Sequence, residues 1–284
     1  MTVHDCVADG RNRLQAAGIP ADEADLDARL LAERALEWTT ERYLTDGDRE
    51  GPPEFAGRYT RLLQRRAARE PFAYIVGFQE FWGLPFEVTP AVLIPRPETE
   101  LLVEILLERF PDRGASFRLC DIGTGSGCIA IAIAHERGQA TIVATDLSAA
   151  ALAVARRNAE RHGAAARVTF TESDLVDAPG RSFEAIVCNP PYVAESDRAA
   201  MQPEVRDYEP AVALFAGPDG LDAIRRLVRH APVHLAPGGW LVFEFGFGQG
   251  DAVAELIASE PSLKMVALRR DLQGIPRAAV VERL

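Results

Sequence analysis

The chain has 284 residues, of which 48% are hydrophobic and 26% are charged, and its 42 acidic and 31 basic residues give a net charge of −11. These values are typical of a soluble globular protein, and no stretch approaches the roughly 18 apolar residues that a membrane span needs. The acidic balance argues against a protein that wraps a long nucleic-acid duplex, because phosphate contacts require clustered Lys and Arg.

The N-terminus has no basic region followed by an apolar run, so we expect no secretory signal. The four cysteines form no Cys-x-x-Cys pair. This pattern argues against a zinc site and against a disulfide framework, so we expect no metal and a reducing, cytoplasmic location.

Residues 1–73 are expected to form a small helical bundle. Helices are predicted over Asp22–Trp38 and about Glu54–Arg69, where apolar residues recur at helical spacing. The predicted apolar face of the first helix consists of Leu26, Leu30, Leu31, Ala35 and Trp38. Because every chemical motif lies after residue 94, we interpret 1–73 as a domain that recognises a partner.

Residues 74–94 are expected to form a β-hairpin linker. The segments Tyr74–Gly77 and Glu80–Val88 are aromatic, β-prone and punctuated by Gly and Pro. A second domain is then expected over 95–284, and it begins with an amphipathic helix over Glu98–Phe110.

From residue 117 onward, short apolar runs alternate with helical segments, which is typical of an α/β, doubly wound, mostly parallel sheet. Seven strands are predicted, over Phe117–Asp121, Thr141–Thr145, Arg167–Thr171, Phe183–Cys188, Trp240–Phe245, Lys264–Arg269 and Ala278–Glu282. The intervening helices are predicted over Cys128–Arg137, Ser148–His162 and Gly220–Leu235.

The pattern D-x-G-x-G-x-G, from Asp121 to Gly127, follows the first of these strands and opens a helix. Glycines let the backbone turn tightly and approach a ligand, and a helix N-terminus offers free N–H groups. Asp146 stands nineteen residues further on, at the end of the second strand, where an acid accepts hydrogen bonds from ribose hydroxyls. The expected ligand-binding residues are Gly123, Thr124, Gly125, Ser126, Gly127 and Asp146.

The glycine spacing differs from the dinucleotide pattern G-x-G-x-x-G, which disfavours an NAD-dependent oxidoreductase. It resembles motif I of the class I S-adenosylmethionine-dependent methyltransferases. That resemblance implies a Rossmann-like methyltransferase sheet, S-adenosylmethionine as the cofactor and contacts of Asp174 and Leu175 with its adenine. Some relatives have an aromatic residue where this chain has Leu175. An acid in an ordinary turn is the alternative interpretation of Asp174.

Asn189-Pro190-Pro191-Tyr192 follows the fourth predicted strand, so it is expected at the sheet edge where ligands bind. An amide or arylamine nitrogen is a poor nucleophile because its lone pair is delocalised. The Asn189 side-chain carbonyl and the Pro190 backbone carbonyl are predicted to accept its two N–H groups and to aim it at a methyl group. Tyr192 is predicted to stack on the planar substrate. The expected catalytic residues are therefore Asn189, Pro190 and Tyr192; Pro191 joins them in binding substrate, and Asn189 also faces the cofactor.

This motif alone leaves the methyl acceptor open. It resembles the motif of N6-adenine and N4-cytosine DNA methyltransferases, of N2-guanine rRNA methyltransferases and of the glutamine N5-methyltransferases of peptide chain release factors. Five blocks in order resemble the last of these families: Pro71–Gly77, Glu80–Gly83, Leu93–Glu100, Asp121–Gly127 and Asn189–Tyr192.

The resemblance implies methylation of the glutamine side chain in the Gly-Gly-Gln motif of class 1 release factors, and so a role in translation termination. It implies a protein partner and no direct binding of nucleic acid. The alternative is an N6-adenine or N2-guanine nucleic-acid methyltransferase that uses the same site.

Two further groups of residues are interpreted separately. Arg96, Glu98 and Thr99 suit a helix start, and the resemblance also implies a loop that closes over the cofactor. Cys120, Cys128 and Cys188 are interpreted as small buried packing residues near the glycine loop.

Overall fold

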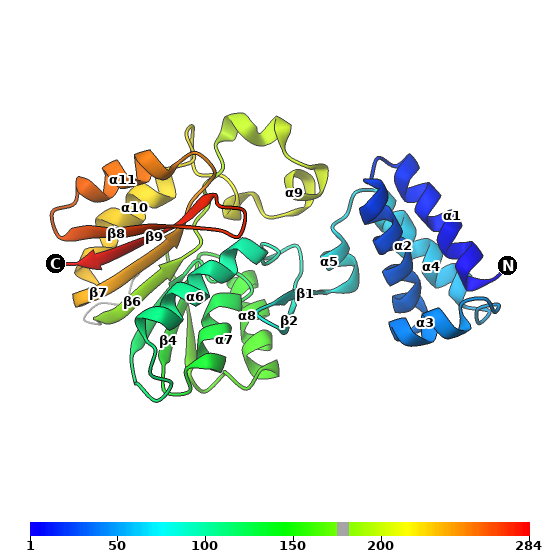
Figure 1. Ribbon diagram of the computed structural model, residues 1–284, viewed down its shortest axis with the longest axis horizontal. Helices are drawn as coiled ribbons and strands as arrows, with labels where there is room; N and C mark the ends of the chain where they lie inside the picture. The colour runs from blue at the N-terminus through cyan, green and yellow to red at the C-terminus, as the bar shows by residue number, and fades with distance from the viewer. Residues whose placement is uncertain (175–181) are drawn as a thin grey trace. The chain divides into compact units, whose positions relative to one another are not determined.

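The computed structural model spans residues 1–284 and describes 1–174 and 182–284, so the predicted adenine contact Leu175 lies outside the described residues. The chain divides into two compact units (Figure 1). The first, here called the helical unit, contains residues 1–77 and 202–208. The second, here called the sheet unit, contains residues 78–201 and 209–284.

The helical unit buries one face of each of its longer helices against the others. In α2 the buried positions include Ala24, Ala28, Leu31 and Ala35, which recur at the spacing of one helix face. Leu26 was predicted on this face and is instead 47% exposed, because a step of two residues turns its side chain away from Ala24 and Ala28. The helices are α1 (Val3–Ala16), α2 (Ala21–Leu36), α3 (Thr40–Asp46), α4 (Phe55–Ala67), α5 (Phe72–Val76) and α9 (Pro203–Tyr208).

The short helix α5 corrects the prediction that Tyr74–Gly77 is β-prone. Pro71 precedes the helix, and Gly77 ends it in the left-handed conformation at φ 85°. These are helix start and stop signals, and they outweigh the β propensity of the residues between them. The hairpin follows directly as β1 (Phe78–Phe81) and β2 (Leu84–Glu87).

Helix α9 belongs to the helical unit although it is far away in the sequence. Arg66 of α4 donates to the Glu204 carboxylate (2.9 Å) and to Asp27 of α2 (2.6 Å). Arg69 donates to the other Glu204 oxygen (2.7 Å), and the Tyr208 hydroxyl donates to the Ala68 carbonyl (2.6 Å). The sequence analysis did not predict this association.

The sheet unit has the predicted fold class, a seven-stranded α/β sheet in the order β5-β4-β3-β6-β7-β9-β8. The strands from β5 to β7 are parallel, and β9 runs antiparallel to both of its neighbours. The strands are β3 (Arg118–Ile122), β4 (Thr141–Asp146), β5 (Val168–Glu172), β6 (Phe183–Cys188), β7 (Leu235–Glu244), β8 (Leu263–Arg270) and β9 (Pro276–Arg283). The helices are α6 (Glu100–Arg109), α7 (Cys128–Glu136), α8 (Ala149–Arg161), α10 (Asp222–His230) and α11 (Gly250–Ala258), with 3₁₀ turns η1 (Pro97–Thr99), η2 (Glu195–Ala200), η3 (Ala211–Ala213) and η4 (Ala231–Val233).

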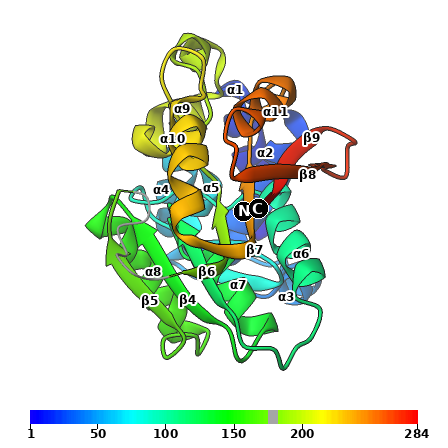
Figure 2. The ribbon, with the colours of Figure 1, turned by 90° about the vertical axis from the view of Figure 1, so that its left-hand side faces the viewer.

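Helices cover both faces of this sheet (Figures 1 and 2). Successive residues of β3 point to opposite faces: Leu119 belongs to a core with α6 and α7, and Cys120 belongs to a core with α10 and α11. Burial on both faces explains why the middle positions of the central strands are mostly apolar. None of the described helices is both long enough and apolar enough to span a membrane.

The predicted helix Gly220–Leu235 is too long. Helix α10 ends at His230, a 3₁₀ turn follows, and Leu235 already begins β7. Pro232 explains the end of the helix, because it lacks the N–H that a continued helix requires.

Candidate active site

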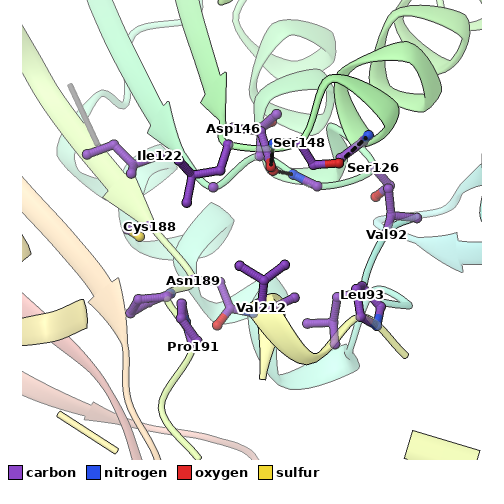
Figure 3. Close-up of a pocket in the computed structure, with 18 of the residues that line it drawn as sticks. Val92, Leu93, Ile122, Ser126, Asp146, Ser148, Cys188, Asn189, Pro191 and Val212 are labelled. Atoms are coloured by element: carbon purple, nitrogen blue, oxygen red, sulfur yellow. Dashed lines mark hydrogen bonds between the residues drawn. The ribbon is translucent and has the colours of Figure 1, made fainter. Parts of the chain in front are cut away.

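One pocket lies in the sheet unit beside the carboxyl ends of β3, β4 and β6 (Figure 3). Its empty volume is about 1180 Å³, including space open to solvent. Asp146, Ser148 and Ser126 lie on one side of it, and Asn189 and Pro191 lie on the other. Of the predicted site residues, those that line it are Gly123, Thr124, Gly125, Ser126, Asp146, Asp174, Asn189, Pro190 and Pro191.

The three glycines of the loop have positive φ angles but different surroundings. Gly123 (φ 68°) and Gly125 (φ 56°) line the pocket, and a methyl group added at either would meet no atom within 4 Å. Gly127 (φ 83°) is not among the described residues that line the pocket. A methyl group there would lie 3.0 Å from Ile131 and 3.2 Å from Ala155, so Gly127 allows close packing of α7 against α8.

Asp146 anchors the glycine loop at the end of β4. Its Oδ2 accepts a hydrogen bond from the Gly125 N–H, and its Oδ1 accepts one from the Ser148 N–H, both at 2.9 Å. Each carboxylate oxygen has a second lone pair, so the side chain is able to accept further donors in the pocket.

Asp121, the first residue of the glycine motif, lies completely buried behind the loop. Its Oδ2 accepts from the Thr124 hydroxyl (2.6 Å) and from the Ala130 N–H (3.3 Å). Burial raises the pKa of Asp121 to about 7. Among the described residues, its Oδ1 and the Ser126 hydroxyl have no hydrogen-bond partner.

Asn189 is fixed by a residue from another part of the chain. Its Nδ2 donates to the Thr99 hydroxyl oxygen at 3.0 Å, across 90 positions of sequence. Because the amide nitrogen faces Thr99, the carbonyl oxygen lies on the opposite branch of the amide. Thr99 is buried within the 3₁₀ turn that precedes α6 and also lines the pocket.

Glu244, at the end of β7, completes this network, and the sequence analysis missed it. Its Oε2 accepts from the Thr99 hydroxyl (2.7 Å) and its Oε1 accepts from the Tyr192 hydroxyl (2.9 Å). Burial raises the pKa of Glu244, and it also raises the pKa of Tyr192. Tyr192 is not among the described residues that line the pocket. The sequence did contain a signal for Glu244, because it is an acidic residue inside the otherwise apolar run Trp240–Phe245.

Two ion pairs lie at the pocket. Arg96 donates to Glu209, which also accepts from the Ile94 N–H (3.2 Å), and Arg226 donates to Asp174 (2.7 Å). Glu98, which was considered together with Arg96 and Thr99, is not among the described lining residues.

The cysteine interpretation is confirmed: Cys120, Cys128 and Cys188 are buried and free. Cys128 and Cys188 line the pocket, and burial raises the pKa of Cys128 to about 12, so it remains a neutral thiol.

The mostly parallel sheet, the glycine loop and the Asn-Pro-Pro-Tyr segment at the same edge define a methyltransferase. Residues 98–205 match the methyltransferase small domain family, and residues 5–77 match the PrmC N-terminal domain. A solved methyltransferase from Pyrococcus furiosus shares the fold, with a TM-score of 0.52 and 19% identity over 80% of this chain and 98% of its own.

Two relatives identify the family. The chain is 42% identical to the release factor glutamine methyltransferase of Koribacter versatilis over 99% of this chain and 98% of that protein. It is 47% identical to that of Geobacter sulfurreducens over 82% of this chain and 80% of that protein. The chain belongs to the release factor glutamine methyltransferase family.

Proposed function

We propose that this methyltransferase transfers a methyl group from S-adenosylmethionine to the side-chain amide nitrogen of the glutamine in the Gly-Gly-Gln motif of class 1 release factors. The observation that supports this most directly is the hydrogen bond from Asn189 to Thr99. It orients the Asn189 carbonyl in a pocket that Pro190, the glycine loop and Asp146 also line.

The pocket residues fit S-adenosylmethionine. Gly123 and Gly125 leave open space where a side chain would otherwise stand, so a ligand is able to approach the backbone. Asp146 retains lone pairs for ribose hydroxyls, and Asp174 also lines the pocket, which supports the proposed contact with the adenine.

S-adenosylmethionine supplies an electrophilic methyl group on its sulfonium. The chain's part is to orient the attacking amide: the Asn189 and Pro190 carbonyls accept its two N–H groups, which raises electron density on nitrogen and aims its lone pair. Proline fixes the backbone that carries the second carbonyl. No general base is needed, because the methylated, still protonated amide is a strong acid and loses its proton to water.

Mass spectrometry of a release factor after incubation with this protein and S-adenosylmethionine tests the proposal. A gain of one methyl group on the Gly-Gly-Gln peptide is expected. Methylation of adenine or guanine in RNA or DNA, without modification of the release factor, would instead support the alternative. A steep salt dependence of nucleic-acid binding would accompany that outcome.

We further propose that residues 1–73 recognise the release factor, that 74–94 link this domain to the catalytic domain over 95–284, and that the enzyme acts in the cytoplasm, where release factors work. The position of the pocket within the sheet unit supports this division. Intact release factor should therefore be methylated with a kcat/KM at least about tenfold above that of a Gly-Gly-Gln peptide. Equal kcat/KM values for the two substrates would mean that the pocket alone recognises the substrate.

A further inference from the structure

A chain of hydrogen bonds runs from Glu244 through Thr99 to Asn189, and its direction is determined by chemistry. While the Glu244 carboxyl group is ionised, it only accepts hydrogen bonds. The single hydroxyl proton of Thr99 is donated to Glu244 at 2.7 Å, so the Thr99 oxygen faces Asn189 as an acceptor. Of the two ends of the Asn189 amide, only the NH₂ group is able to satisfy that acceptor.

Both Glu244 and Thr99 are shielded from water. Glu244 is 2% exposed and Thr99 is 2% exposed, so water does not readily replace either partner. The second oxygen of Glu244 is taken by the Tyr192 hydroxyl at 2.9 Å. Both carboxylate oxygens therefore accept from hydroxyl groups, and both hydroxyl protons point toward Glu244.

We propose that Glu244 is a positioning residue for methyl transfer, which acts through the Thr99 hydroxyl to hold the Asn189 amide with its carbonyl oxygen toward the substrate. This rests on the proposed function, because Asn189 is there the acceptor for the substrate amide. Without the carboxylate, the Thr99 hydroxyl is free to donate to the Asn189 oxygen instead. The amide then turns, and its NH₂ group meets the N–H of the substrate.

A matched pair of substitutions at Thr99 tests the relay. Thr99→Val keeps the size and branching of the side chain but removes the hydroxyl, whereas Thr99→Ser keeps the hydroxyl. Thr99→Val should lower the single-turnover rate on a Gly-Gly-Gln substrate by about 10- to 100-fold. Thr99→Ser should stay within about threefold of the wild type, and both should bind S-adenosylhomocysteine within about threefold of it.

Glu244→Gln, alone and combined with Thr99→Val, tests whether the carboxylate acts through Thr99. Glu244→Gln alone should slow transfer by about 10-fold or more, because its NH₂ group is able to donate to Thr99 and reverse the chain. In the Thr99→Val background it should cost no more than about threefold further, since residues that act in one chain are not additive. Thermal unfolding of each variant separates this effect from a loss of folded protein.

Wild-type rates from Thr99→Val, or full additivity of Thr99→Val and Glu244→Gln, would overturn the proposal. A wild-type enzyme that binds cofactor but leaves the release factor unmodified would contradict the proposed function itself. The two failures are therefore distinguishable in the same set of measurements.

Discussion

Asn158 of α8 donates a hydrogen bond from its side-chain amide to the backbone carbonyl of Ser126 in the glycine loop, at 2.9 Å. The same amide accepts from the Glu87 N–H (2.8 Å) and donates to the Glu87 carbonyl (3.0 Å). One completely buried side chain therefore joins the glycine loop to the second strand of the hairpin. Three backbone groups depend on it.

Asn158→Leu keeps the size of the side chain and removes all three hydrogen bonds. We expect a loss of about 2–4 kcal/mol in the free energy of unfolding, because buried backbone groups are left without partners. Affinity for S-adenosylhomocysteine should fall as well, since the Ser126 backbone is released. Urea unfolding and calorimetry measure the two effects. Arg157→Ala is the matched control: its ion pair with Glu87 is half exposed and should contribute less than about 1 kcal/mol. Equal losses from the two variants would contradict the role of Asn158.

Asp146→Ala should weaken S-adenosylhomocysteine binding by about 1–3 kcal/mol, because the cofactor loses a charged acceptor. The Gly125 and Ser148 N–H groups also lose theirs, so the loop itself becomes less ordered. Calorimetry checks the affinity. An unchanged value would mean that Asp146 orders the loop without reaching the ribose.

The glycines of the loop should separate into two classes on substitution by alanine. Gly127→Ala should destabilise the fold by about 1–3 kcal/mol, through its positive φ and through overpacking against Ile131 and Ala155. Gly125→Ala carries a similar φ strain but meets open space, so it should reduce cofactor affinity more than stability. Chemical unfolding and cofactor titration of both variants give the comparison. If the two variants lost stability and cofactor affinity to the same extents, Gly127 would also contact the ligand.

The sequence was most informative where an element or a motif consists of residues that are adjacent in the sequence. The fold class was predicted correctly, and Phe183–Cys188 matches β6 at both ends, because five of its six residues are apolar and Asn189-Pro190 follows directly. The glycine loop was likewise placed between strand and helix, since its residues follow one another in the chain.

The parts that were missed depend on tertiary contacts. Glu244 meets Thr99 across 145 positions, and Arg66 meets Glu204 across 138, and no local pattern encodes either pairing. Gly127 has the same local signature as the other loop glycines, so only the packing of α7 on α8 reveals its different role. The predicted stacking of Tyr192 was based on residue type alone, and the hydroxyl that bonds Glu244 is visible only in the structure.

Asp121 should make stability depend on pH in an unusual direction for a carboxyl group. Its pKa lies near 3.9 in an unfolded chain and rises to about 7 in the fold, so the folded state holds this proton more tightly. Its contribution to stability is therefore fully present below about pH 4 and is lost as the pH rises toward 7.

Asp121→Asn removes this titration. As the pH rises from about 4 to 7, the free energy of unfolding of the wild type should fall by a few kcal/mol relative to that of the variant. Urea unfolding at a series of pH values measures it, and the comparison cancels the titration of the other carboxyl groups. A difference that does not change with pH would show that the pKa of Asp121 is the same in the folded and the unfolded chain.

Asn189→Ala should abolish most methyl transfer while leaving cofactor affinity within about tenfold of the wild type. The loss of one preorganised partner of the reacting group typically costs about 10²–10³ in kcat. Single-turnover rates on a Gly-Gly-Gln substrate, with cofactor affinity measured separately, provide the test. Near wild-type transfer by this variant would contradict the proposed mechanism.

Asn189→Asp distinguishes acceptor strength from positioning. It keeps an acceptor oxygen but loses the NH₂ group that donates to Thr99, and it places a second carboxylate on the same hydroxyl as Glu244. Thr99 has one proton and is able to satisfy only one of them. The added charge also stabilises the sulfonium of the ground state more than the transition state, in which that charge is dispersed. We therefore expect Asn189→Asp to bind cofactor at least as well as Asn189→Ala and yet to transfer methyl poorly. Substantial activity in Asn189→Asp would show that an acceptor oxygen alone is sufficient and that its orientation by Thr99 is not required.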